Sequence, residues 1–208
     1  MWQTSLRQLE NGLKLPGVVE ERCVHARVEN ASCRACVDVC PRGAWHLDDA
    51  RLGLDTEACD GCGLCVAACP EGALIHDYLP QAIRAPEGAL AFAACERAVA
   101  VGEAGEAHVS CLHALPLRAI LALYRSGVHA LRLAHEDCRG CPRAGGLSIF
   151  RLLEHLNDLL RQRQLPQIGY RVLGREQWRD ALRQARRRDQ GPRLSRRGFL
   201  RGALGYAC

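Results

Sequence analysis

The sequence offers little that would take the chain into or across a membrane. None of its apolar stretches approaches the roughly 18 residues that a membrane-spanning helix needs. The first ten residues, MWQTSLRQLE, have neither an apolar core nor a cleavage site, so they do not form a secretory signal. We therefore expect a cytoplasmic protein in a reducing compartment, where clustered cysteines bind metal more often than they pair as disulfides.

Signatures of catalysis and of nucleotide binding are also lacking. No glycine-rich loop follows a predicted strand, and no nucleophile stands beside a base in a known arrangement. Residues 1–170 carry 17 basic and 20 acidic side chains, whereas residues 171–208 carry 11 basic and 3 acidic ones. Because phosphate contact needs a basic face on the fold, the mildly acidic body argues against nucleic-acid binding. We expect no enzymatic activity and no small-molecule substrate.

Cysteine, by contrast, is abundant, with 13 residues in a chain of 208. Seven of them stand in two runs of the same spacing, 29 residues apart, and each run ends in Cys-Pro. The runs consist of Cys33, Cys36 and Cys40, and of Cys59, Cys62, Cys65 and Cys69. Thiolates two residues apart wrap a loop around one corner of a metal cluster, while the last cysteine starts a helix that leads to another cluster.

Over about residues 20–80 this pattern resembles the bacterial two-cluster ferredoxins. The resemblance implies an α+β ferredoxin-like dicluster module that holds two [4Fe–4S] clusters. In this family the fourth cysteine of each run binds the other cluster. The resemblance therefore implies that one cluster, which we call cluster two, is bound by Cys40, Cys59, Cys62 and Cys65. The other, cluster one, would take Cys33, Cys36, Cys69 and one further ligand.

That further ligand is where the sequence departs from the family. The position that aligns with Cys59 is occupied by Asn30, a poor iron ligand. Cys23, ten residues before Cys33, is the nearest substitute, and a loop of that length can bring it in. We predict that Cys23 completes cluster one, with a three-iron cluster as the main alternative. Two zinc sites and a disulfide framework are weaker alternatives, because zinc sites are built from separated cysteine pairs.

After Pro86 the pattern changes to alternating strands and helices. Apolar runs and helical spacing predict strands at 90–94, 107–110, 128–134 and 168–173 and helices at 117–125 and 149–160. This alternation predicts a small α/β domain with a mostly parallel sheet, in which groups that follow the strands meet at one edge. The cysteines expected at this edge, as a further metal site, are Cys95, Cys111, Cys138 and Cys141. Each of them alone could be an ordinary buried thiol.

Residues 88–175 also resemble the delta-subunit family of methyl-viologen-reducing hydrogenases. The resemblance rests on strands that end at Cys95 and at Ser110-Cys111, on a leucine-rich helix, and on the segment before the Cys138/Cys141 pair. It implies a third iron–sulfur centre and electron transfer between a hydrogenase or formate dehydrogenase and a heterodisulfide-reductase-type complex. Since the cysteine spacing is not identical, a [2Fe–2S] cluster, a [4Fe–4S] cluster, zinc and an empty dithiol are all alternatives for this centre.

Three of the histidines in this region are considered as possible ligands. His113 and His135 are near the cysteines in sequence, and histidine can replace cysteine as an iron ligand. The simpler interpretation is that both are surface or hydrogen-bonded side chains. His155 lies on the predicted helix 149–160, where we expect it to face solvent.

The end of the chain is rich in arginine. Its segment Ser195–Arg201, SRRGFLR, resembles a twin-arginine export motif, but such a signal works at an N-terminus and before an apolar stretch. We therefore interpret residues 176–208 as a solvated charged helix or a docking tail. Cys208, at the terminus, is not expected to be a ligand.

These patterns predict three parts: a two-cluster ferredoxin domain with an N-terminal extension at 1–84, an α/β cysteine-containing domain at 85–175, and an Arg-rich tail at 176–208. The predicted function is iron–sulfur electron transfer, as a subunit that relays single electrons within or to a redox enzyme complex. Its partners would be redox proteins, and the polypeptide would do no bond chemistry of its own. The alternative is an assembly or regulatory protein whose clusters are structural or sensory.

Overall fold

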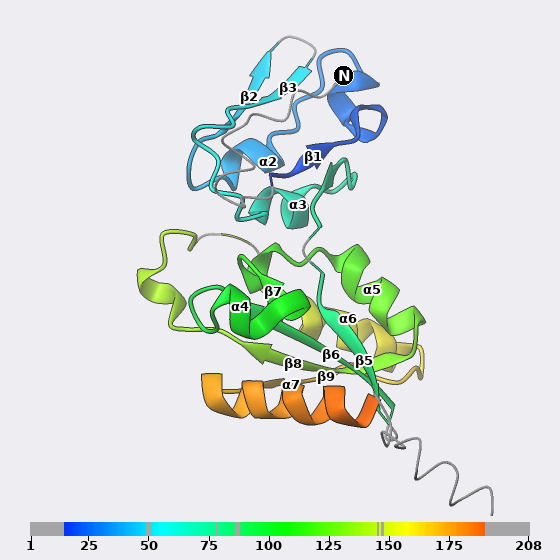
Figure 1. The fold of residues 1–208 in the computed structure, drawn as a ribbon. Coiled ribbons are helices and arrows are strands. Elements are labelled where there is room, and N and C mark those ends of the chain that lie inside the picture. The colour runs from blue at the N-terminus through cyan, green and yellow to red at the C-terminus, as the bar shows by residue number, and fades with distance from the viewer. Residues whose placement is uncertain are drawn as a thin grey trace, which may run out of the picture.

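The computed structural model describes residues 15–48, 51–77, 79–85, 88–144, 146 and 148–189. Figure 1 shows two parts, one above the other: an N-terminal part of short elements and a C-terminal part built around a sheet. Helix α3 of the N-terminal part faces the C-terminal part. Among the described residues, no helix combines the length and the apolar character needed to span a membrane.

The described residues of the N-terminal part form two small antiparallel sheets and two short helices. Strand β1 (Gly17–Val18) pairs with β4 (Leu74–Ile75), and β2 (Trp45–Asp48) pairs with β3 (Arg51–Leu54). The helices are α2 (Ala35–Asp38) and α3 (Leu64–Ala68), preceded by 3-10 turns at Glu20–Arg22 and Val24–Ala26. Helix α2 carries Cys36, and α3 carries Cys65, which is the residue aligned with it in the internal repeat. The repeat of sequence is therefore also a repeat of structure.

A small core holds this part together. Its fully buried members are Trp45, Cys65, Val66 and Leu74. One of them, Cys65, belongs to the second cysteine run, so one of the buried side chains of this small core is a thiol. This agrees with a domain whose stability depends on what its cysteines bind.

The C-terminal part is built on a five-stranded mixed sheet. Its strands are β5 (Gln81–Ala85), β6 (Gly88–Cys95), β7 (His108–Val109), β8 (Val128–Ala134) and β9 (Gly169–Val172). The order is β5-β6-β8-β9, with β7 paired to the last residues of β6. The strands β6, β7, β8 and β9 are parallel, and β5 is antiparallel to β6. The carboxyl ends of four strands therefore lie at one edge.

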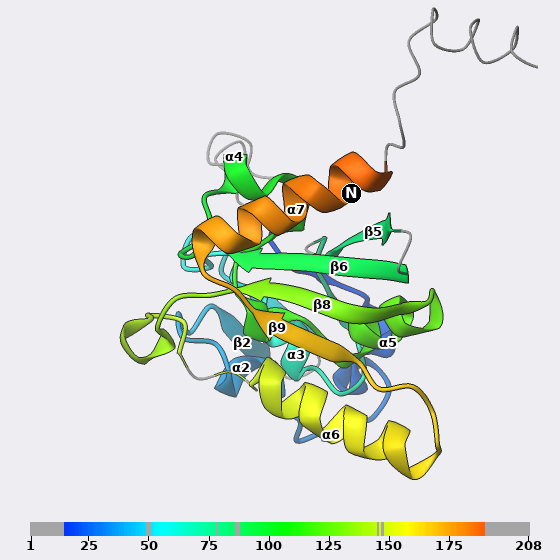
Figure 2. The same cartoon turned by 90° about the horizontal axis from the view of Figure 1, so that it is seen from below.

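Helices cover both faces of this sheet (Figure 2). They are α4 (Val101–Ala104), α5 (Leu117–Arg125), α6 (Ile149–Gln162) and α7 (Arg175–Asp189), with 3-10 turns at Gly105–Ala107, Leu112–Ala114 and Cys138–Gly140. Apolar residues of α5 and α6 pack on one face, against alternate residues of β6 and β8 such as Ala91 and Leu131. The residues in between, such as Phe92, face α7. Both faces of the central strands are thus buried, which explains their continuous apolar runs.

The elements expected after residue 86 are present. The predicted helices at 117–125 and 149–160 are α5 and α6, and the predicted strands correspond to β6, β7, β8 and β9. The sheet differs from the expectation at its edge. Strand β5 (81–85) pairs with β6 and so belongs to the C-terminal sheet, although the sequence pattern placed residues up to 84 with the ferredoxin domain.

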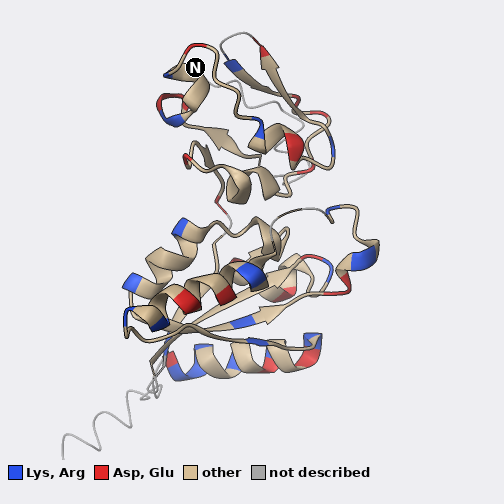
Figure 3. Cartoon of the chain, turned by 180° about the vertical axis from the view of Figure 1, so that it is seen from behind, with Lys and Arg blue, Asp and Glu red and all other residues tan. Residues whose placement is uncertain are grey.

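The Arg-rich end also differs from the expectation. Residues 175–189 form α7, which packs on the sheet rather than lying free in solvent. Trp178 and Leu182 are buried there, the Trp178 ring lies 6.0 Å from that of Phe92, and its indole N–H donates to the Arg132 carbonyl at 2.9 Å. Charges of both signs occupy the rest of the helix (Figure 3). The SRRGFLR segment and Cys208 lie outside the described residues.

Candidate metal centres

Four cysteines of the N-terminal part gather around the start of α3. Cys59 and Cys62 precede the helix, Cys65 lies within it, and Cys40 follows α2. They are near enough to one another that the charges of Cys40, Cys59 and Cys62 all act on Cys65. Cys62 and Cys65 are only 6 % and 5 % exposed. The structure therefore places together the four cysteines that the resemblance assigns to cluster two.

Polar hydrogens point at these thiols from several sides. The backbone N–H of Ala44 donates to the Cys40 Sγ at 3.4 Å, and backbone groups of Gly61 and Leu64 hydrogen-bond Cys59 and Cys62. The side chain of Trp45, in β2, hydrogen-bonds Cys65. Hydrogen bonds of this kind stabilise a thiolate, and those around a cluster set its reduction potential.

Burial opposes ionisation of the same thiols. It raises the pKa of both Cys62 and Cys65 to about 12, despite the hydrogen bonds that each receives. Since a thiol must lose its proton to bind metal, a nearby positive charge is needed to stabilise the thiolate at neutral pH. Iron ions supply that charge in a cluster, and the buried thiol set fits such a group.

A second group of four cysteines lines another pocket of the N-terminal part. Its members are Cys23, Cys33, Cys36 and Cys69. Cys23 lies between two 3-10 turns, and the imidazole of His25 hydrogen-bonds the Cys33 carbonyl at 2.7 Å, which fastens this segment to the first cysteine run. Asn30 is exposed and has a left-handed φ of 60°. Cys23, and not the aligned position 30, thus lies with the cysteines that the resemblance assigns to cluster one.

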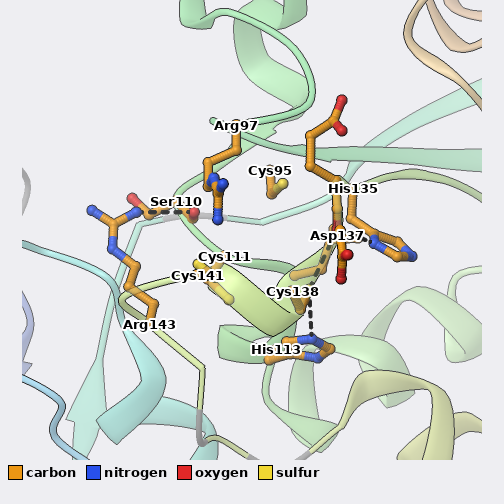
Figure 4. A pocket seen from close by; sticks show the side chains of 12 residues that line it. Cys95, Arg97, Ser110, Cys111, His113, His135, Asp137, Cys138, Cys141 and Arg143 are labelled. Carbon is orange, nitrogen blue, oxygen red and sulfur yellow. Dashed lines mark hydrogen bonds between the residues drawn. The ribbon is translucent and has the colours of Figure 1, made fainter.

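Four further cysteines come together at the edge of the C-terminal sheet. Cys95 ends β6, Cys111 follows β7 after one residue, and Cys138 and Cys141 lie in and after the 3-10 turn that follows β8. All four line one pocket, shown in Figure 4. Burial, together with the charges of the three other cysteines, raises the pKa of Cys111 to about 11. We refer to this group as the third thiol set.

His113 and Arg97 contact the third thiol set. The His113 Nδ1 accepts the Ile149 N–H at 3.2 Å, so in the neutral ring Nε2 carries the proton, and it lies 3.6 Å from the Cys138 Sγ (Figure 4). Burial lowers the His113 pKa, which favours this neutral form. Arg97 hydrogen-bonds Cys141 from the solvent side. His113 is thus a hydrogen-bonded side chain, as the simpler interpretation of the sequence has it.

His135 and His155, the two other histidines considered from the sequence, differ in their surroundings. His135 lines the same pocket, but its Nδ1 lies 2.7 Å from the Glu136 carbonyl, to which it donates. His155 is exposed on α6, as predicted.

The third thiol set lies directly against the cysteines of cluster two. Cys62, Leu64 and Cys111 form one buried group that spans the two parts of the chain. Leu64 is 2 % exposed and approaches Gly146 so closely that a Cβ there would lie 2.6 Å from it. Gly63, with a φ of 77°, leaves room for Ala114, since a Cβ at Gly63 would lie 3.3 Å from the Ala114 Cβ. The interface is therefore close-packed where the two thiol sets meet.

The spacing of the thiols bears on what they could bind. Within the described part of the chain, no three His, Cys, Asp or Glu side chains form a group that would hold a single metal ion. In an iron–sulfur cubane each thiolate binds its own iron, so the four thiolates of such a site surround the cluster and need not converge on one point.

Sequence reasoning missed several polar residues of these sites. Trp45, Arg97 and Arg143 carry no local signal, because their partners lie between 20 and 83 residues away or depend on the docking of the two parts. Arg143 follows the Cys138/Cys141 pair by only two residues, which is the one hint that the sequence contains.

Comparisons with known proteins agree with the N-terminal geometry. A family model described as a 4Fe-4S dicluster domain matches residues 29–74, which contain both cysteine runs but not Cys23. The ferredoxin 7Fe of Hydrogenibacillus schlegelii is 35 % identical over 65 residues, which are 31 % of this chain and 77 % of that protein.

Two longer relatives are similar over the same region. A subunit of the ion-translocating oxidoreductase complex of Methanosarcina acetivorans is 32 % identical over 68 residues, 33 % of this chain and 23 % of that protein. The thiosulfate reductase electron transfer subunit PhsB of Salmonella typhi is 42 % identical over 64 residues, 30 % of this chain and 31 % of that protein. The chain thus spans a third or less of these two relatives. No solved structure gave a significant match.

Proposed function

Because this chain belongs to the ferredoxin family, with a 4Fe-4S dicluster domain at residues 29–74, we propose that it relays single electrons between protein partners as a subunit of a redox complex. It is an iron–sulfur electron-transfer protein, and its relatives are ferredoxins and electron-transfer subunits rather than catalytic ones. Iron–sulfur clusters supply the chemistry when bound, by taking up and releasing single electrons.

The chain's own residues would bind two [4Fe–4S] clusters in the N-terminal domain. Cluster two is held by Cys40, Cys59, Cys62 and Cys65, and the observation that carries this assignment is their mutual proximity, with Cys62 and Cys65 buried. The surrounding N–H groups stabilise the thiolates, and exclusion of water strengthens every charge interaction there.

Cluster one is held by Cys33, Cys36, Cys69 and Cys23. The support for Cys23 is its place on the wall of the pocket that the three other cysteines line. Cys23 lies outside the matched family segment, and one relative is described as a 7Fe ferredoxin, so a cluster of three irons is the competing state of this site.

The third thiol set would hold one more iron–sulfur centre. Cys95, Cys111, Cys138 and Cys141 lie around one pocket and adjoin the cysteines of cluster two. A zinc ion at this place would have no redox role, whereas an iron–sulfur centre would extend the electron path of the dicluster domain. The His113 N–H and the Arg97 guanidinium both favour negative charge on these thiolates.

We place the domains accordingly, with the dicluster domain ending before β5 and the α/β domain extending through α7 to residue 189. The likeness of residues 88–175 to the delta-subunit family of hydrogenases suggests the class of partner, namely a hydrogenase, a formate dehydrogenase or a heterodisulfide-reductase-type complex. The names of two relatives, which refer to an oxidoreductase complex and to thiosulfate reductase, support membership in a redox complex of this general kind. A cytoplasmic location is part of the same proposal.

One experiment tests the proposal as a whole. The protein is purified without oxygen, and its iron, acid-labile sulfide and zinc are counted while co-purifying proteins are identified. We expect clearly more than about eight irons, since two cubanes account for about eight and a third centre adds to them. Reversible reduction by a low-potential donor, with onward transfer to an acceptor, distinguishes electron transfer from a structural or sensory role. Clusters that bleach only on destruction would contradict the proposal.

A further inference from the structure

Arg143 connects the two domains at the place where two thiol sets meet. Its Nε donates to the Asp60 Oδ2 at 3.0 Å, and its Nη2 to the Asp60 carbonyl at 3.5 Å. Its Nη1 donates to the Ser110 carbonyl at 3.2 Å and also pairs with the Glu96 carboxylate. The Arg143 side chain is only 13 % exposed. One guanidinium therefore contacts three different loops.

Each of these loops carries proposed ligands. Asp60 stands between Cys59 and Cys62, in the loop that leads into α3. The Asp60 carboxylate also accepts the Cys62 N–H at 3.2 Å. The contact between Arg143 and Asp60 therefore also restrains the backbone of this loop.

On the side of the α/β domain, the partners of Arg143 are immediate neighbours of the third thiol set. Glu96 follows Cys95, and Ser110 precedes Cys111. Arg143 itself follows Cys141 by two residues. A single side chain thus joins the backbone of one proposed cluster-two loop to three segments of the third thiol set.

The chemistry of this contact suits arginine. A guanidinium has five N–H donors in a rigid plane, which lets it bind two carboxylates and two carbonyls at once, whereas lysine offers a single point of charge. The Arg143 guanidinium and the Asp60 carboxylate form a salt bridge in the interface, with side chains that are 13 % and 28 % exposed.

We infer that Arg143 is a positioning residue that holds the Cys59–Cys62 loop against the third thiol set, so that cluster two and the third centre stay in one fixed contact. The inference rests on the proposed function, because it concerns two of the centres proposed above. The rate of electron exchange between two centres depends on their separation. The two thiol sets meet at the buried group of Cys62, Leu64 and Cys111, and Arg143 would keep the separation there constant.

Arg118 provides a matched control. It also joins the two domains, through a hydrogen bond of 2.6 Å from its Nη2 to the Leu74 carbonyl. It lies on α5, away from the third thiol set, and none of its described contacts is with a neighbour of that set. Loss of Arg118 removes one interdomain contact without touching the loops that Arg143 joins.

The test compares Arg143→Gln, Arg143→Lys and Arg118→Gln with the unaltered full chain, all purified without oxygen. Iron and sulfide are counted, amide hydrogen exchange is measured by segment, and the dithionite-reduced proteins are examined by EPR. For Arg143→Gln we expect full iron content, about tenfold faster exchange of the amides at 61–64 and 112–114, and loss of the magnetic interaction between cluster two and the third centre. Arg143→Lys should fall in between, and Arg118→Gln should leave both readouts unchanged.

Two results would overturn the inference. In the first, Arg143→Gln keeps the exchange rates and the magnetic interaction of the unaltered chain. In the second, it loses iron and Arg143→Lys does not restore it, which would make Arg143 a folding residue. If the unaltered chain holds only about eight irons, the third centre of the proposed function fails. The exchange rates at 61–64 and 112–114 then decide by themselves whether Arg143 positions the loop.

Discussion

The two domains of this chain gather their cysteines in different ways. In the dicluster domain seven cysteines come from two runs in which only two or three residues separate neighbouring cysteines, and each run surrounds a helix of four or five residues. In the α/β domain the four cysteines are spread from Cys95 to Cys141 and meet only because parallel strands end at the same edge. The first arrangement is local and the second depends on the whole sheet.

This difference affects stability as well as geometry. One of the four buried side chains in the core of the dicluster domain is a thiol, and three further cysteines pack against that core. The buried members of the two cores of the α/β domain are leucine, isoleucine, valine, alanine, phenylalanine and tryptophan, with no cysteine among them. We therefore expect the dicluster domain to depend on its clusters for folding, and the α/β domain to fold without a metal. The predictions below test this contrast.

The largest effect is expected for Cys65→Ser. Cys65 is a proposed ligand of cluster two and is 5 % exposed in the core of the dicluster domain. The variant should lose about four irons and unfold that domain at lower temperature, because loss of a thiolate ligand removes the cluster whose binding stabilises the folded domain. Iron analysis and thermal unfolding by circular dichroism measure both effects.

Cys208→Ser is the control for this variant, and it should keep its iron and its unfolding temperature. The helical signal of the α/β domain should persist in Cys65→Ser after the dicluster domain has unfolded. A single transition in which both domains unfold together would show that the contrast between them is wrong.

The next effect in size is expected for Cys138→Ser. Removal of this member of the third thiol set should abolish the third centre while about eight irons remain. The α/β domain should stay folded, since Cys138 contributes to neither of its cores. Iron counts and EPR spectra of the reduced protein measure the loss. Arg139→Gln, a change at the neighbouring exposed residue, should leave both unchanged. Loss of all iron from Cys138→Ser would contradict the independence of the domains.

Cys23→Ser should have a smaller effect. Without its fourth thiolate, cluster one should lose about one iron and become a three-iron cluster, so that roughly half of the cubane EPR signal disappears. Asn30→Gly is the matched control, because glycine accepts the left-handed φ of 60° at the position that aligns with Cys59. Unchanged spectra for Cys23→Ser would remove Cys23 from the ligand set.

The smallest effect is expected for His113→Leu. The His113 Nε2–H lies 3.6 Å from the Cys138 Sγ, and a hydrogen bond to a ligand thiolate stabilises the more negative, reduced state of a cluster. Its removal should make the potential of the third centre more negative without loss of iron, as measured by redox titration. His135→Leu, in the same pocket but bonded to the Glu136 carbonyl, should shift the potential less. Equal shifts in the two variants would argue against this role of His113.

Several features of the structure could be predicted from the sequence because they depend on short-range patterns. The elements α5 and β8 lie at the residues expected from their apolar spacing. Helix α7 was missed as a packed element because its many arginines conceal a narrow apolar stripe of Trp178, Leu182 and Ala185, which is buried only against the sheet. Strand β5 was missed because it pairs with a later strand, so that no pattern within 81–85 reveals its domain.

The sequence by itself determined the two cysteine runs and their chemistry. Ligands with only two or three residues between them stay close together whatever conformation the short loop adopts. Only the tertiary structure decided the position of Cys23 beside the first run, since a ten-residue loop can lead in many directions. It also decided that four strand ends bring the third thiol set together, and that Arg143 reaches Asp60 from 83 residues away. Contacts of such separation arise from the packing of two domains, which no local spacing encodes.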